Sequence, residues 1–589
     1  MRRLLISCLV VAASVDAWVG ARQAPYRTHN DRFAAPRLST LDAWKTRAEY
    51  LRAHVLASAG LLPLPDKTPL RPSVFGEVTR AGYRVSKVYF ESLPGFFVTG
   101  NLYRPIGDGP FPAVLSPHGH WTYGRLENTP TSSGPARAIG LARQGFVVFS
   151  YDMVGYNDSQ QLPHTFGGRR EQLWGLSLAG LQLWNGIRAL DFLETLPYVR
   201  RDALAATGES GGGTQTFLLA AADSRVKVAV PVNMISLHMQ GGCLCENPPA
   251  LRLDTTNVEI AATIAPRPML MVSATADWTA ETLEVEYPAV RAVYDLFGVA
   301  DRVQAVRMTA EHNYNKDSRE AMYAWMARWL QQAPPDVRIS ERGFSVEPLP
   351  DLLVFHRRPV PAEAVTAAQL TDAWIAAAKR QLGTTPSADA VTALRHVLAL
   401  GLKNEAGGAK TVDGLAAFNR NVLLTHTDPA VGKALSSAGF AVRPITLTPF
   451  DDGAASKVQH FDTYNRTAAG QRVADLVAAI RANPGAAIVA DGDAALAALL
   501  ASAVAPVPVA ILDVGRFDTS SDTGYLDRLY IPGLRRAGDL QTAASLARGK
   551  VLVHNAGDRF AVSGVETQAR PLTPGEIAGT LRKVAPARR

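Results

Sequence analysis

Hydrophobic and polar residues alternate along the chain in two distinct ways. Over residues 40–60 the apolar positions recur at helical spacing, which predicts a helix. Short runs rich in β-branched and aromatic residues follow, bounded by glycine, proline and asparagine, as is typical of strands. The expected strands cover residues 83–92, 96–105, 111–120, 145–155, 199–210, 225–233 and 267–279.

Helical patterns separate the later strands. The clearest of them span residues 176–196, 282–298 and 318–332. Strands that alternate with helices predict an α/β fold with a mostly parallel sheet that helices cover on both faces. The first strands lie too close together in sequence for crossover helices, so we expect antiparallel additions at that end of the sheet.

The chain has 589 residues, which is long enough for two or more domains. After residues 1–21, discussed below, we expect a lead and helix at 22–75, an α/β domain at 76–335 and a linker at 336–350. An alanine-rich region at 351–589 alternates in the same way and predicts a second α/β domain.

The second domain repeats the order of segments in the first. Residues 421–442 resemble the region of the third and fourth expected strands, and residues 486–503 resemble residues 204–221. The spacing agrees, because Ser210 lies 67 residues before Asp277 and Gly492 lies 66 residues before Asp558. Residues 472–480 also resemble residues 186–194, and residues 531–558 resemble residues 248–277. Any two alanine-rich α/β domains share some likeness, but four matches in the same order favour an internal repeat.

The stretch GESGG at residues 208–212 follows an apolar run and precedes a helical pattern. Strand, G-x-S-x-G and helix is the context of a nucleophile held on a sharp turn, which makes Ser210 a candidate nucleophile. The motif alone is common by chance. A serine hydroxyl also needs a base to take its proton and a carboxylate to orient that base.

The chain order Ser, Asp, His identifies candidate partners for Ser210. Asp277 follows the apolar strand at 267–276, and His312 lies in a loop before the last helix of the domain. Asp277 could instead cap the next helix, and two other carboxylates compete with it from the preceding loop, Glu246 and Asp254. His238 is the other downstream histidine of this domain, but it precedes Asp277 and does not fit the order.

The loop SPHGHWTYGR at 116–125 stands where hydrolases of this motif carry part of their oxyanion hole. We expect the backbone N–H groups of His120 and Gly211 to form that hole. The remaining candidates for substrate contact are His118, Trp121 and Glu209. The alternative for the H-x-H pair is a metal site, but the sequence presents no third ligand, so no metal and no cofactor are expected.

The second domain departs from this pattern. Glycine replaces serine at the turn, as Gly492 within ADGDA, and no histidine follows Asp558. His426 stands where the first domain has the loop at 116–125, and Asp558 stands where it has Asp277. The expectation is a degenerate hydrolase-like domain without its own catalysis.

Composition narrows the partners and the compartment. The net charge of +8 is spread along the chain without a Lys/Arg run, so no nucleic-acid partner is expected. Two arginines and an apolar stretch within residues 1–21 resemble a secretory signal, the alternative being a membrane anchor. With that signal removed no membrane association is expected, and the protein would be secreted or periplasmic. The motifs leave the oligomeric state open.

Only three cysteines occur, and Cys8 would leave with the signal. Cys243 and Cys245 could close only a strained ring, so the fold is not stapled by disulfides, and their redox state stays open.

Several motifs taken together are similar to those of bacterial acetyl xylan esterase-like α/β-hydrolases, a group related to the dienelactone hydrolase and prolyl oligopeptidase branches. The resemblance covers about residues 40–330 and rests on HGHW at 118–121, YDMVGYNDS at 151–159, GESGGGTQT at 208–216, GGCLCENPP at 241–249, residues 251–279 and EHNYN at 311–315. It implies the α/β-hydrolase fold and Ser210, Asp277 and His312 as a triad.

The resemblance also implies an exported serine esterase acting on carbohydrate esters such as acetylated xylan. Three alternatives stay open. A prolyl oligopeptidase-type peptidase would need a β-propeller region, and no repeat of that kind precedes the hydrolase domain. A glucuronoyl-type esterase carries an arginine beside its nucleophile, where this chain has Gly211. A glycan-binding protein without activity would not need the three residues in order.

Overall fold

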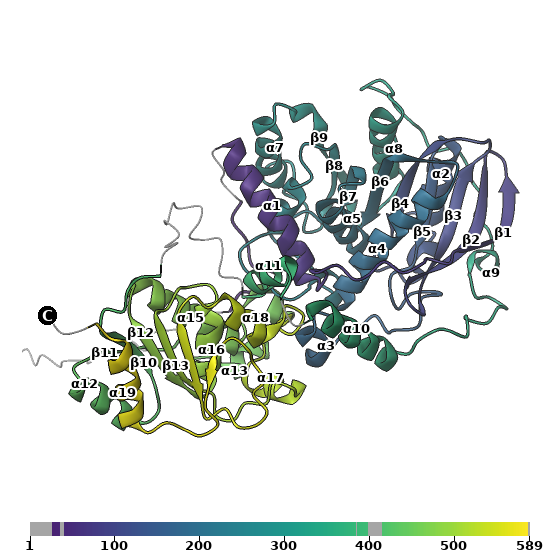
Figure 1. Ribbon diagram of the computed structural model, residues 1–589. Helices are drawn as coiled ribbons and strands as arrows, with labels where there is room; N and C mark the ends of the chain where they lie inside the picture. Colours follow the sequence, from purple (N-terminus) through teal and green to yellow (C-terminus); the bar gives the residue numbers. More distant parts are fainter. Residues whose placement is uncertain (1–25, 36–39, 384–385, 399–414, 587–589) are drawn as a thin grey trace, which may run out of the picture.

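The computed structural model describes residues 26–35, 40–383, 386–398 and 415–586. It contains two α/β units that lie side by side (Figure 1), the first coloured purple to teal and the second green to yellow. The expected signal at residues 1–21 lies outside the described residues.

The first unit is built on a nine-stranded sheet with the order β1-β2-β3-β5-β4-β6-β7-β8-β9. The pairs β1–β2, β2–β3 and β3–β5 are antiparallel, and all the others are parallel. The strands are β1 (Ser73–Arg80), β2 (Tyr83–Leu93), β3 (Phe96–Pro105), β4 (Phe111–Pro117), β5 (Val147–Tyr151), β6 (Val199–Glu209), β7 (Val226–Val232), β8 (Met269–Ala276) and β9 (Val303–Glu311).

Helices cover both faces of this sheet. The side chains of α1, α4, α5, α6 and α7 form the core on one face, and those of α2 and α8 form the core on the other. The helices are α1 (Leu41–Ser58), α2 (Gly134–Arg143), α3 (Arg169–Leu173), α4 (Leu178–Thr195), α5 (Gly211–Ala222), α6 (Asn257–Ala262), α7 (Glu286–Leu296) and α8 (Lys316–Leu330). The fold is therefore the expected α/β-hydrolase architecture, with antiparallel strands at its beginning.

Each strand expected from the sequence is present, but the two edge strands, β1 and β9, were not predicted. Their residues are mostly half-buried or exposed. An edge strand packs against one neighbour only, so it does not need the continuous apolar run that marked the inner strands.

The segment after α8 differs from the linker expected at 336–350. Its apolar side chains, including Ile339 and Phe344, pack against the core of the first unit. The helix α10 (Ala367–Leu382) also belongs there, since Leu370 and Trp374 lie in the core formed with α1 and α4. The first unit thus extends through α9 (Leu349–Leu352) and α10. The apolar residues of α10 recur at helical spacing and pack against the first unit, whereas a linker would leave such residues exposed.

The second unit has a six-stranded parallel sheet with the order β11-β10-β12-β13-β14-β15. Its strands are β10 (Asn421–Thr425), β11 (Ala441–Pro444), β12 (Ala487–Asp491), β13 (Val509–Asp513), β14 (Lys550–His554) and β15 (Glu566–Thr567). Its helices are α11 (Ala388–Val397), α12 (Pro429–Ser437), α13 (Asp452–Ala455), α14 (Phe461–Tyr464), α15 (Ala468–Ala482), α16 (Gly492–Ser502), α17 (Asp522–Arg528), α18 (Asp539–Leu546) and α19 (Pro574–Val584).

The two sheets share one topology in their parallel parts. Across each sheet, the strand that comes second in the chain lies at one end, the first strand lies next to it, and the other four follow in chain order. This order holds for β5-β4-β6-β7-β8-β9 and for β11-β10-β12-β13-β14-β15. The helices correspond too, because α12 and α19 share one face of the second sheet as α2 and α8 share one face of the first. This agrees with an internal repeat.

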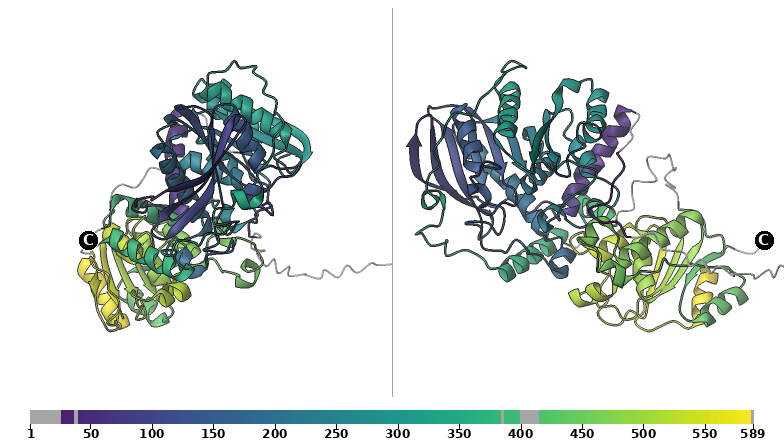
Figure 2. Two further views of the ribbon diagram at one scale, coloured as in Figure 1. Left: turned by 90° about the vertical axis from the view of Figure 1, so that its right-hand side faces the viewer. Right: turned by 180° about the vertical axis from the view of Figure 1, so that it is seen from behind.

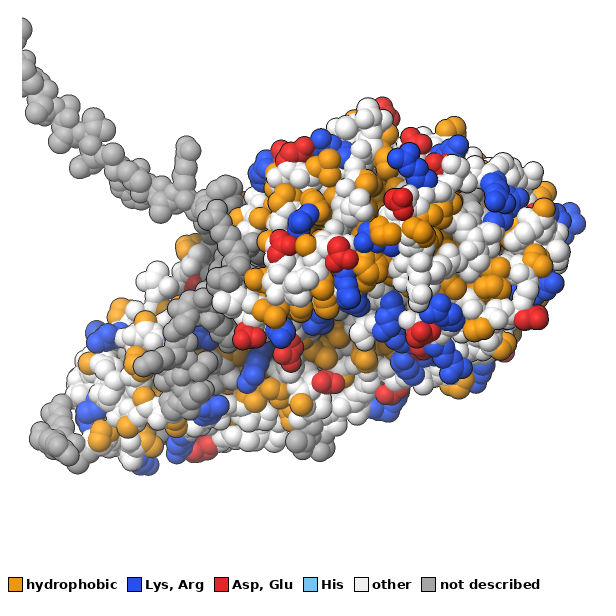
Figure 3. All heavy atoms as spheres, turned by 90° about the horizontal axis from the view of Figure 1, so that it is seen from above, with side chains coloured by type: hydrophobic (Ala, Val, Ile, Leu, Met, Phe, Trp, Pro, Cys, Tyr) orange, Lys and Arg blue, Asp and Glu red, His pale blue; other side chains and the backbone are white. Residues whose placement is uncertain are grey.

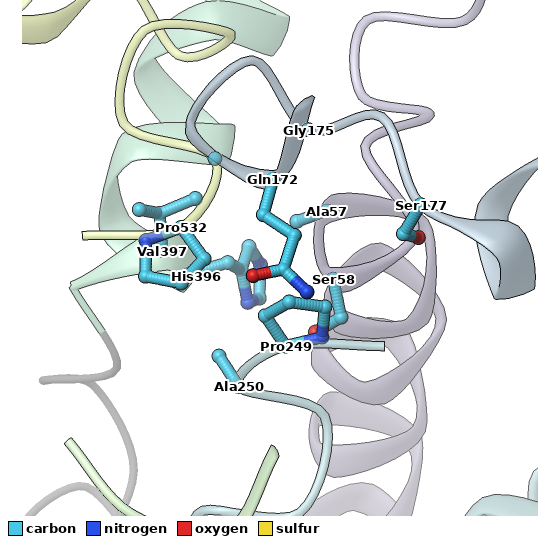
Figure 4. A pocket seen from close by; sticks show the side chains of 11 residues that line it. Ala57, Ser58, Gln172, Gly175, Ser177, Pro249, Ala250, His396, Val397 and Pro532 are labelled. Atoms are coloured by element: carbon cyan, nitrogen blue, oxygen red, sulfur yellow. The ribbon is translucent and has the colours of Figure 1, made fainter. Parts of the chain in front are cut away.

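The two units meet through α3, α10 and α11 (Figures 1 and 2). Asp522 at the start of α17 accepts hydrogen bonds from Trp174 Nε1 at 2.9 Å and from Arg170 Nε at 3.0 Å. A small pocket of about 10 Å³, room for about one water molecule, lies at the junction (Figure 4). Residues from both units line it, among them Gln172, His396 and Pro532.

On the face shown in Figure 3, Lys and Arg side chains are interspersed with Asp and Glu. Within the described ranges, no helix is long and apolar enough to cross a membrane.

Candidate active site

Ser210 occupies the sharp turn between β6 and α5. Its backbone has φ +56° and ψ −124°, a conformation that is strained for a residue with a side chain. The flanking glycines allow this turn to pack closely, since a Cβ on Gly208 or on Gly212 would lie within 2.5 Å of the Pro117 carbonyl oxygen. The side chain of Ser210 is thereby placed at the carboxyl end of the sheet, half-exposed at the start of a helix.

Asp277 and His312 meet at the same end of the sheet. His312 Nδ1 lies 2.9 Å from Asp277 Oδ2, within hydrogen-bond distance. The other carboxylate oxygen of Asp277 accepts the Thr279 N–H at 2.7 Å, which fixes the carboxylate in place. The Asp277 side chain is 2% exposed and that of His312 is 24% exposed, so the imidazole lies between a buried acid and the surface.

Two tryptophans flank the His312 ring. The centroid of Trp278 lies 4.5 Å from it and that of Trp121 lies 6.1 Å from it. His312 Nε2 is buried and has no hydrogen-bond partner among the described residues. Ser210 lies close by, because a Cβ on Gly119 would contact both Trp121 Nε1 and Ser210 Cβ. Trp121 thus lies beside both His312 and Ser210, and His312 Nε2 is free of any bond to the described residues.

The loop at 118–121 follows β4, and His118 holds it from inside. Its ring is fully buried. His118 Nε2 accepts the Met153 N–H at 2.9 Å, so Nδ1 carries the proton and donates to the Gly119 carbonyl at 2.7 Å. Burial lowers the pKa of His118 to about 3, and the ring is neutral at physiological pH. The expected direct contact between His118 and substrate is therefore wrong, since both nitrogens are occupied and the ring has no exposed surface.

Glu209 is also buried beneath the site. Arg137 Nη1 donates to one carboxylate oxygen at 2.6 Å, and Trp121 Nε1 and Ser132 Oγ donate to the other at 2.7 and 3.0 Å. Burial alone would favour the neutral acid, but the charge and hydrogen bond of Arg137 outweigh it and hold the pKa of Glu209 below its ordinary value. Glu209 orients Trp121 through its hydrogen bond. The sequence predicted that Glu209 contacts substrate, but its side chain is buried, with the residue only 1% exposed.

The two residues expected to supply the oxyanion hole, Gly211 and His120, are neighbours in the structure. Gly211 is the first residue of α5, and its N–H has no acceptor within the helix. The ring of His120 lies against this turn, because a Cβ on Gly211 would be 2.5 Å from His120 Cε1. A side chain on Gly211 would thus push the His120 loop away from Ser210.

A group of four side chains beside this loop was not foreseen. His120, His164, Cys243 and Cys245 bring their nitrogen and sulfur atoms within 4.8 Å of one another. The hydrogen bond from Cys245 is the largest of the causes that hold the pKa of Cys243 far below its ordinary value, while burial raises the pKa of Cys245. The expected absence of a metal site rested on the lack of a third ligand near His118 and His120. His118 is not part of the group. The three candidate ligands besides His120 come from distant loops, and a spacing pattern within one segment could not reveal them.

The corresponding turn of the second unit also has a residue with positive φ but lacks the hydroxyl. Gly492 begins α16 directly after β12, with φ +57°. Asp491, which precedes it, accepts the Thr427 N–H at 2.9 Å and lies 3.6 Å from His426 Nδ1. Asp558 is exposed. Among the described residues of this unit, no serine and histidine are placed as Ser210 and His312 are.

Comparisons with known proteins agree with this architecture. No protein-family model matches the chain. The chain is 26% identical over 288 residues to a protein of Bacillus subtilis (strain 168) named "Putative hydrolase YtaP", which covers 45% of this chain and 95% of that protein. The solved structure of "Methylesterase BT1017" is 28% identical, has a TM-score of 0.50, and matches 57% of this chain and 75% of that one. A glucuronoyl esterase from Solibacter usitatus is 17% identical with a TM-score of 0.38 and covers 53% of this chain and all of that one, a likeness of fold alone.

The fold, the Ser210 turn and these similarities place the first unit in the class of esterase-like α/β-hydrolases. A second α/β unit with its own parallel sheet follows it in the same chain.

Proposed function

We propose that the protein is a serine esterase in which Ser210 is the nucleophile, His312 the general base and Asp277 the group that orients His312. The observation that carries this proposal is the Asp277–His312 contact of 2.9 Å at the same sheet end as the strained Ser210 turn. In the apo geometry such groups need only lie within reach, since catalytic hydrogen bonds tighten when substrate binds.

The reaction proceeds in two steps. Ser210 Oγ attacks the acyl carbon while His312 Nε2 takes the hydroxyl proton, and the negative charge on the carbonyl oxygen is met by the N–H groups of Gly211 and His120. His312 then gives its proton to the departing alcohol oxygen. Water attacks the acyl-enzyme in the same way, and the acid leaves as Ser210 regains its proton. Asp277 stabilises the imidazolium that forms in each step.

We propose carbohydrate esters as the substrate class, with acetylated xylan or its oligosaccharides as the first candidate. Trp121 and Trp278 flank His312 and offer aromatic surface beside the reacting atoms, a common lining for small-molecule sites. The likeness to a methylesterase gives a specific reason for a second candidate, a methyl-esterified acidic sugar. The described part of the chain forms two sheets and no β-propeller, which disfavours the peptidase alternative.

Export forms part of this proposal. Residues 1–21 carry the features of a secretory signal, and a polymeric carbohydrate must be met outside the cytoplasm. N-terminal sequencing of the protein from a periplasmic or culture fraction tests this. A mature N-terminus close to residue 22 is expected, and an intact Met1 in the cytoplasmic fraction would contradict export.

The catalytic proposal is tested with p-nitrophenyl acetate, using the wild type and Ser210→Ala. Loss of a nucleophile that acts in a triad lowers kcat by roughly 10³-fold or more. Asp277→Asn is expected to retain the fold and lose about 10⁴-fold, because the imidazole is left in the wrong tautomer. Equal hydrolysis by the wild type and Ser210→Ala would reject Ser210 as the nucleophile. No hydrolysis by either protein would favour the glycan-binding alternative.

The substrate is tested by direct comparison at equal enzyme concentration. Acetate release from acetylated xylan, methanol release from methyl-esterified pectin and cleavage of proline-containing peptides distinguish the three candidates. Acetate release alone supports the first candidate and methanol release alone the second. Cleavage of the peptides alone would overturn the carbohydrate proposal.

A further inference from the structure

Three loops at the carboxyl end of the sheet bring together two imidazoles and two thiols. His120 comes from the loop after β4, His164 from the loop after β5, and Cys243 and Cys245 from the loop after β7. Their ligand atoms all lie within 4.8 Å of one another, and His120 Nε2 is 3.1 Å from Cys245 Sγ. Cys245 is buried and the other three are half-buried.

The surrounding contacts hold these groups in the orientation that a metal would need. His164 Nδ1 lies 2.6 Å from the Val154 carbonyl oxygen, so Nδ1 carries the proton and Nε2 keeps its lone pair. Within the described residues His164 Nε2 is buried without a hydrogen-bond partner. A backbone carbonyl that fixes the tautomer of a histidine is the usual outer partner of a histidine that binds a metal.

The cysteine loop is fixed in a similar manner. Glu246 Oε2 accepts the N–H groups of Gly242 and Cys243 at 2.8 and 3.0 Å, which closes the turn that carries both thiols. The backbone of the loop thus does not depend on a bond between the two sulfurs.

We propose that His120, His164, Cys243 and Cys245 bind one Zn²⁺ ion. Two sulfur and two nitrogen donors form the ligand set of tetrahedral structural zinc, and two thiolates with two neutral imidazoles cancel the charge of the ion. At zinc–ligand distances of about 2.0–2.3 Å, tetrahedral ligands lie roughly 3.3–3.8 Å apart. The separations within the group therefore need to shorten by at most about 1.5 Å.

Four protein ligands leave no position for water or substrate, so the ion has a structural role. The part of the protein that the ion would stabilise is the loop at 118–121. The His120 ring lies against Gly211, and the backbone of the same loop approaches Ser210. Zinc bound through the His120 side chain fixes the loop whose backbone N–H faces the acyl oxygen. This effect on catalysis rests on the proposed function, whereas metal binding itself does not.

The first experiment measures metal in the full-length protein, purified without chelator from a medium that contains zinc. Mass spectrometry of the metal content is expected to give about one zinc per chain. In the protein stripped of metal, added Zn²⁺ is expected to protect both thiols from a thiol reagent and to raise the melting temperature. A protein that takes up no zinc while its two thiols are free, or that holds a Cys243–Cys245 disulfide as purified, would overturn the proposal.

Variants identify the ligands. The double variant Cys243→Ser, Cys245→Ser should abolish stoichiometric zinc binding. Loss of a hydrogen-bond partner of a metal ligand typically lowers metal affinity by about 10–100-fold, and His164→Ala, which removes a ligand itself, should lower zinc affinity by at least that much. The control His238→Ala removes an exposed histidine outside the group and should keep the zinc. If the cysteine variants do not fold, Co²⁺ in the stripped wild-type protein still reports the site, since two thiolates in a tetrahedral set give sulfur-to-cobalt charge-transfer absorption. Co²⁺ without those bands would overturn the ligand assignment.

Ser210→Ala separates the two proposals. It should retain one zinc per chain while losing ester hydrolysis, so a failure of the serine mechanism leaves the metal result intact. His164 forms no hydrogen bond or ring contact with Ser210 or His312 among the described residues, so His164→Ala should lower kcat only through the His120 loop. Zinc loss with unchanged kcat would overturn the link to the oxyanion loop.

Discussion

Glu209, the residue before Ser210, connects the candidate site to the interior of the first unit. Its carboxylate accepts hydrogen bonds from Arg137 and Trp121, and neither carboxylate nor guanidinium has significant exposed surface. The Arg137 guanidinium also lies over the Tyr314 ring, 4.6 Å from its centroid. A charge pair of this kind depends on both members, since either one alone would be left buried and uncompensated.

We therefore expect Glu209→Gln to lower the free energy of unfolding by about 3–5 kcal/mol, because Arg137 loses its counter-charge. The double variant Glu209→Gln, Arg137→Met should be less destabilised than the sum of the single variants, by roughly 0.5–3 kcal/mol. Urea unfolding followed by tryptophan fluorescence measures all three proteins.

An exposed pair provides the control for the Glu209 prediction. Arg32 and Glu281 are each more than half exposed, and Glu281→Gln should cost no more than about 1 kcal/mol. Equal costs for Glu209→Gln and Glu281→Gln would show that burial of the Arg137 pair contributes nothing.

At the same scale, the sequence is informative about chemistry and silent about burial. The order Ser210, Asp277, His312 identifies side chains that lie at one end of the sheet, because strand ends converge there. It does not reveal that His118 and Glu209 are buried, since a histidine or glutamate beside a catalytic motif looks the same whether it faces substrate or protein. His164 and the two cysteines come from loops remote in sequence, so only the folded chain brings them to His120.

At the scale of the element, a residue with positive φ stands at the turn between strand and helix in both units. Ser210 has φ +56° and Gly492 has φ +57°. A positive φ costs a residue with a Cβ about 1–3 kcal/mol, whereas glycine adopts it freely. The first unit thus retains a strained residue at its turn, and the second does not.

Exchanging the residues tests this difference. Ser210→Gly should raise the free energy of unfolding by roughly 1 kcal/mol and abolish ester hydrolysis. Gly492→Ser should lower stability by about 1–2 kcal/mol without creating activity, because no histidine follows Asp558 in the place that His312 has after Asp277. A Cβ on Gly492 would meet no other atom within 4 Å, so the cost comes from the backbone alone.

The matched control is Gly575→Ser in α19, where φ is not positive and a Cβ also meets no neighbour within 4 Å. Its stability should change by less than about 0.5 kcal/mol. If Gly575→Ser and Gly492→Ser cost the same, backbone strain does not explain the turn. Hydrolysis by Gly492→Ser above that of the wild type would contradict a second unit without catalysis.

Strands with a continuous apolar run and helices with apolar residues along one whole face could be predicted from the sequence. The edge strands, which pair with one neighbouring strand only, could not. The inner strands β4 to β8 each carry several buried residues in succession. The strand β9 has one buried residue and eight that are half-buried or exposed. The helix α10 has a clear stripe, but the pattern alone cannot identify which of the two units it packs against.

At the scale of the molecule, the two units are joined by polar contacts as well as by packing. The second unit reaches the loop after the cysteines, where Tyr464 Oη donates to Asn247 Oδ1 at 2.7 Å and Thr463 Oγ1 donates to the Asn247 carbonyl at 2.9 Å. The second unit therefore supports a loop that begins two residues after Cys245. This gives the second unit a structural role that does not require a ligand of its own.

Histidine rings are buried at this junction. His396 of α11 lies beside Tyr50 and His54 of α1, with ring centroids 4.3 and 5.5 Å away, and it lines the pocket of Figure 4. Burial lowers the pKa of His396 to about 3, with the neighbouring charges of His54 and Arg395 acting in the same direction. Burial also lowers the pKa of His54. Both rings are therefore neutral in the folded protein at physiological pH.

These neutral histidines make the stability of the molecule depend on pH in a defined window. Below pH 6.5 the unfolded chain binds a proton at each ring, while the folded chain does not protonate His396 until the pH approaches 3. Unfolding is thus favoured as the pH falls from 6.5 toward 3. His396 alone should account for a loss of about 2 kcal/mol between pH 7 and pH 5.

Replacing His396 by phenylalanine removes that titration and keeps a ring at the junction. The fall in the free energy of unfolding from pH 7 to pH 5, measured by urea titration, should be smaller in His396→Phe than in the wild type by about 2 kcal/mol. Val397→Ala changes the packing of the same pocket without a titratable group, so it should lower stability by a similar amount at both pH values. A pH dependence in His396→Phe equal to that of the wild type would mean that His396 accepts its proton without opening the junction between the two units.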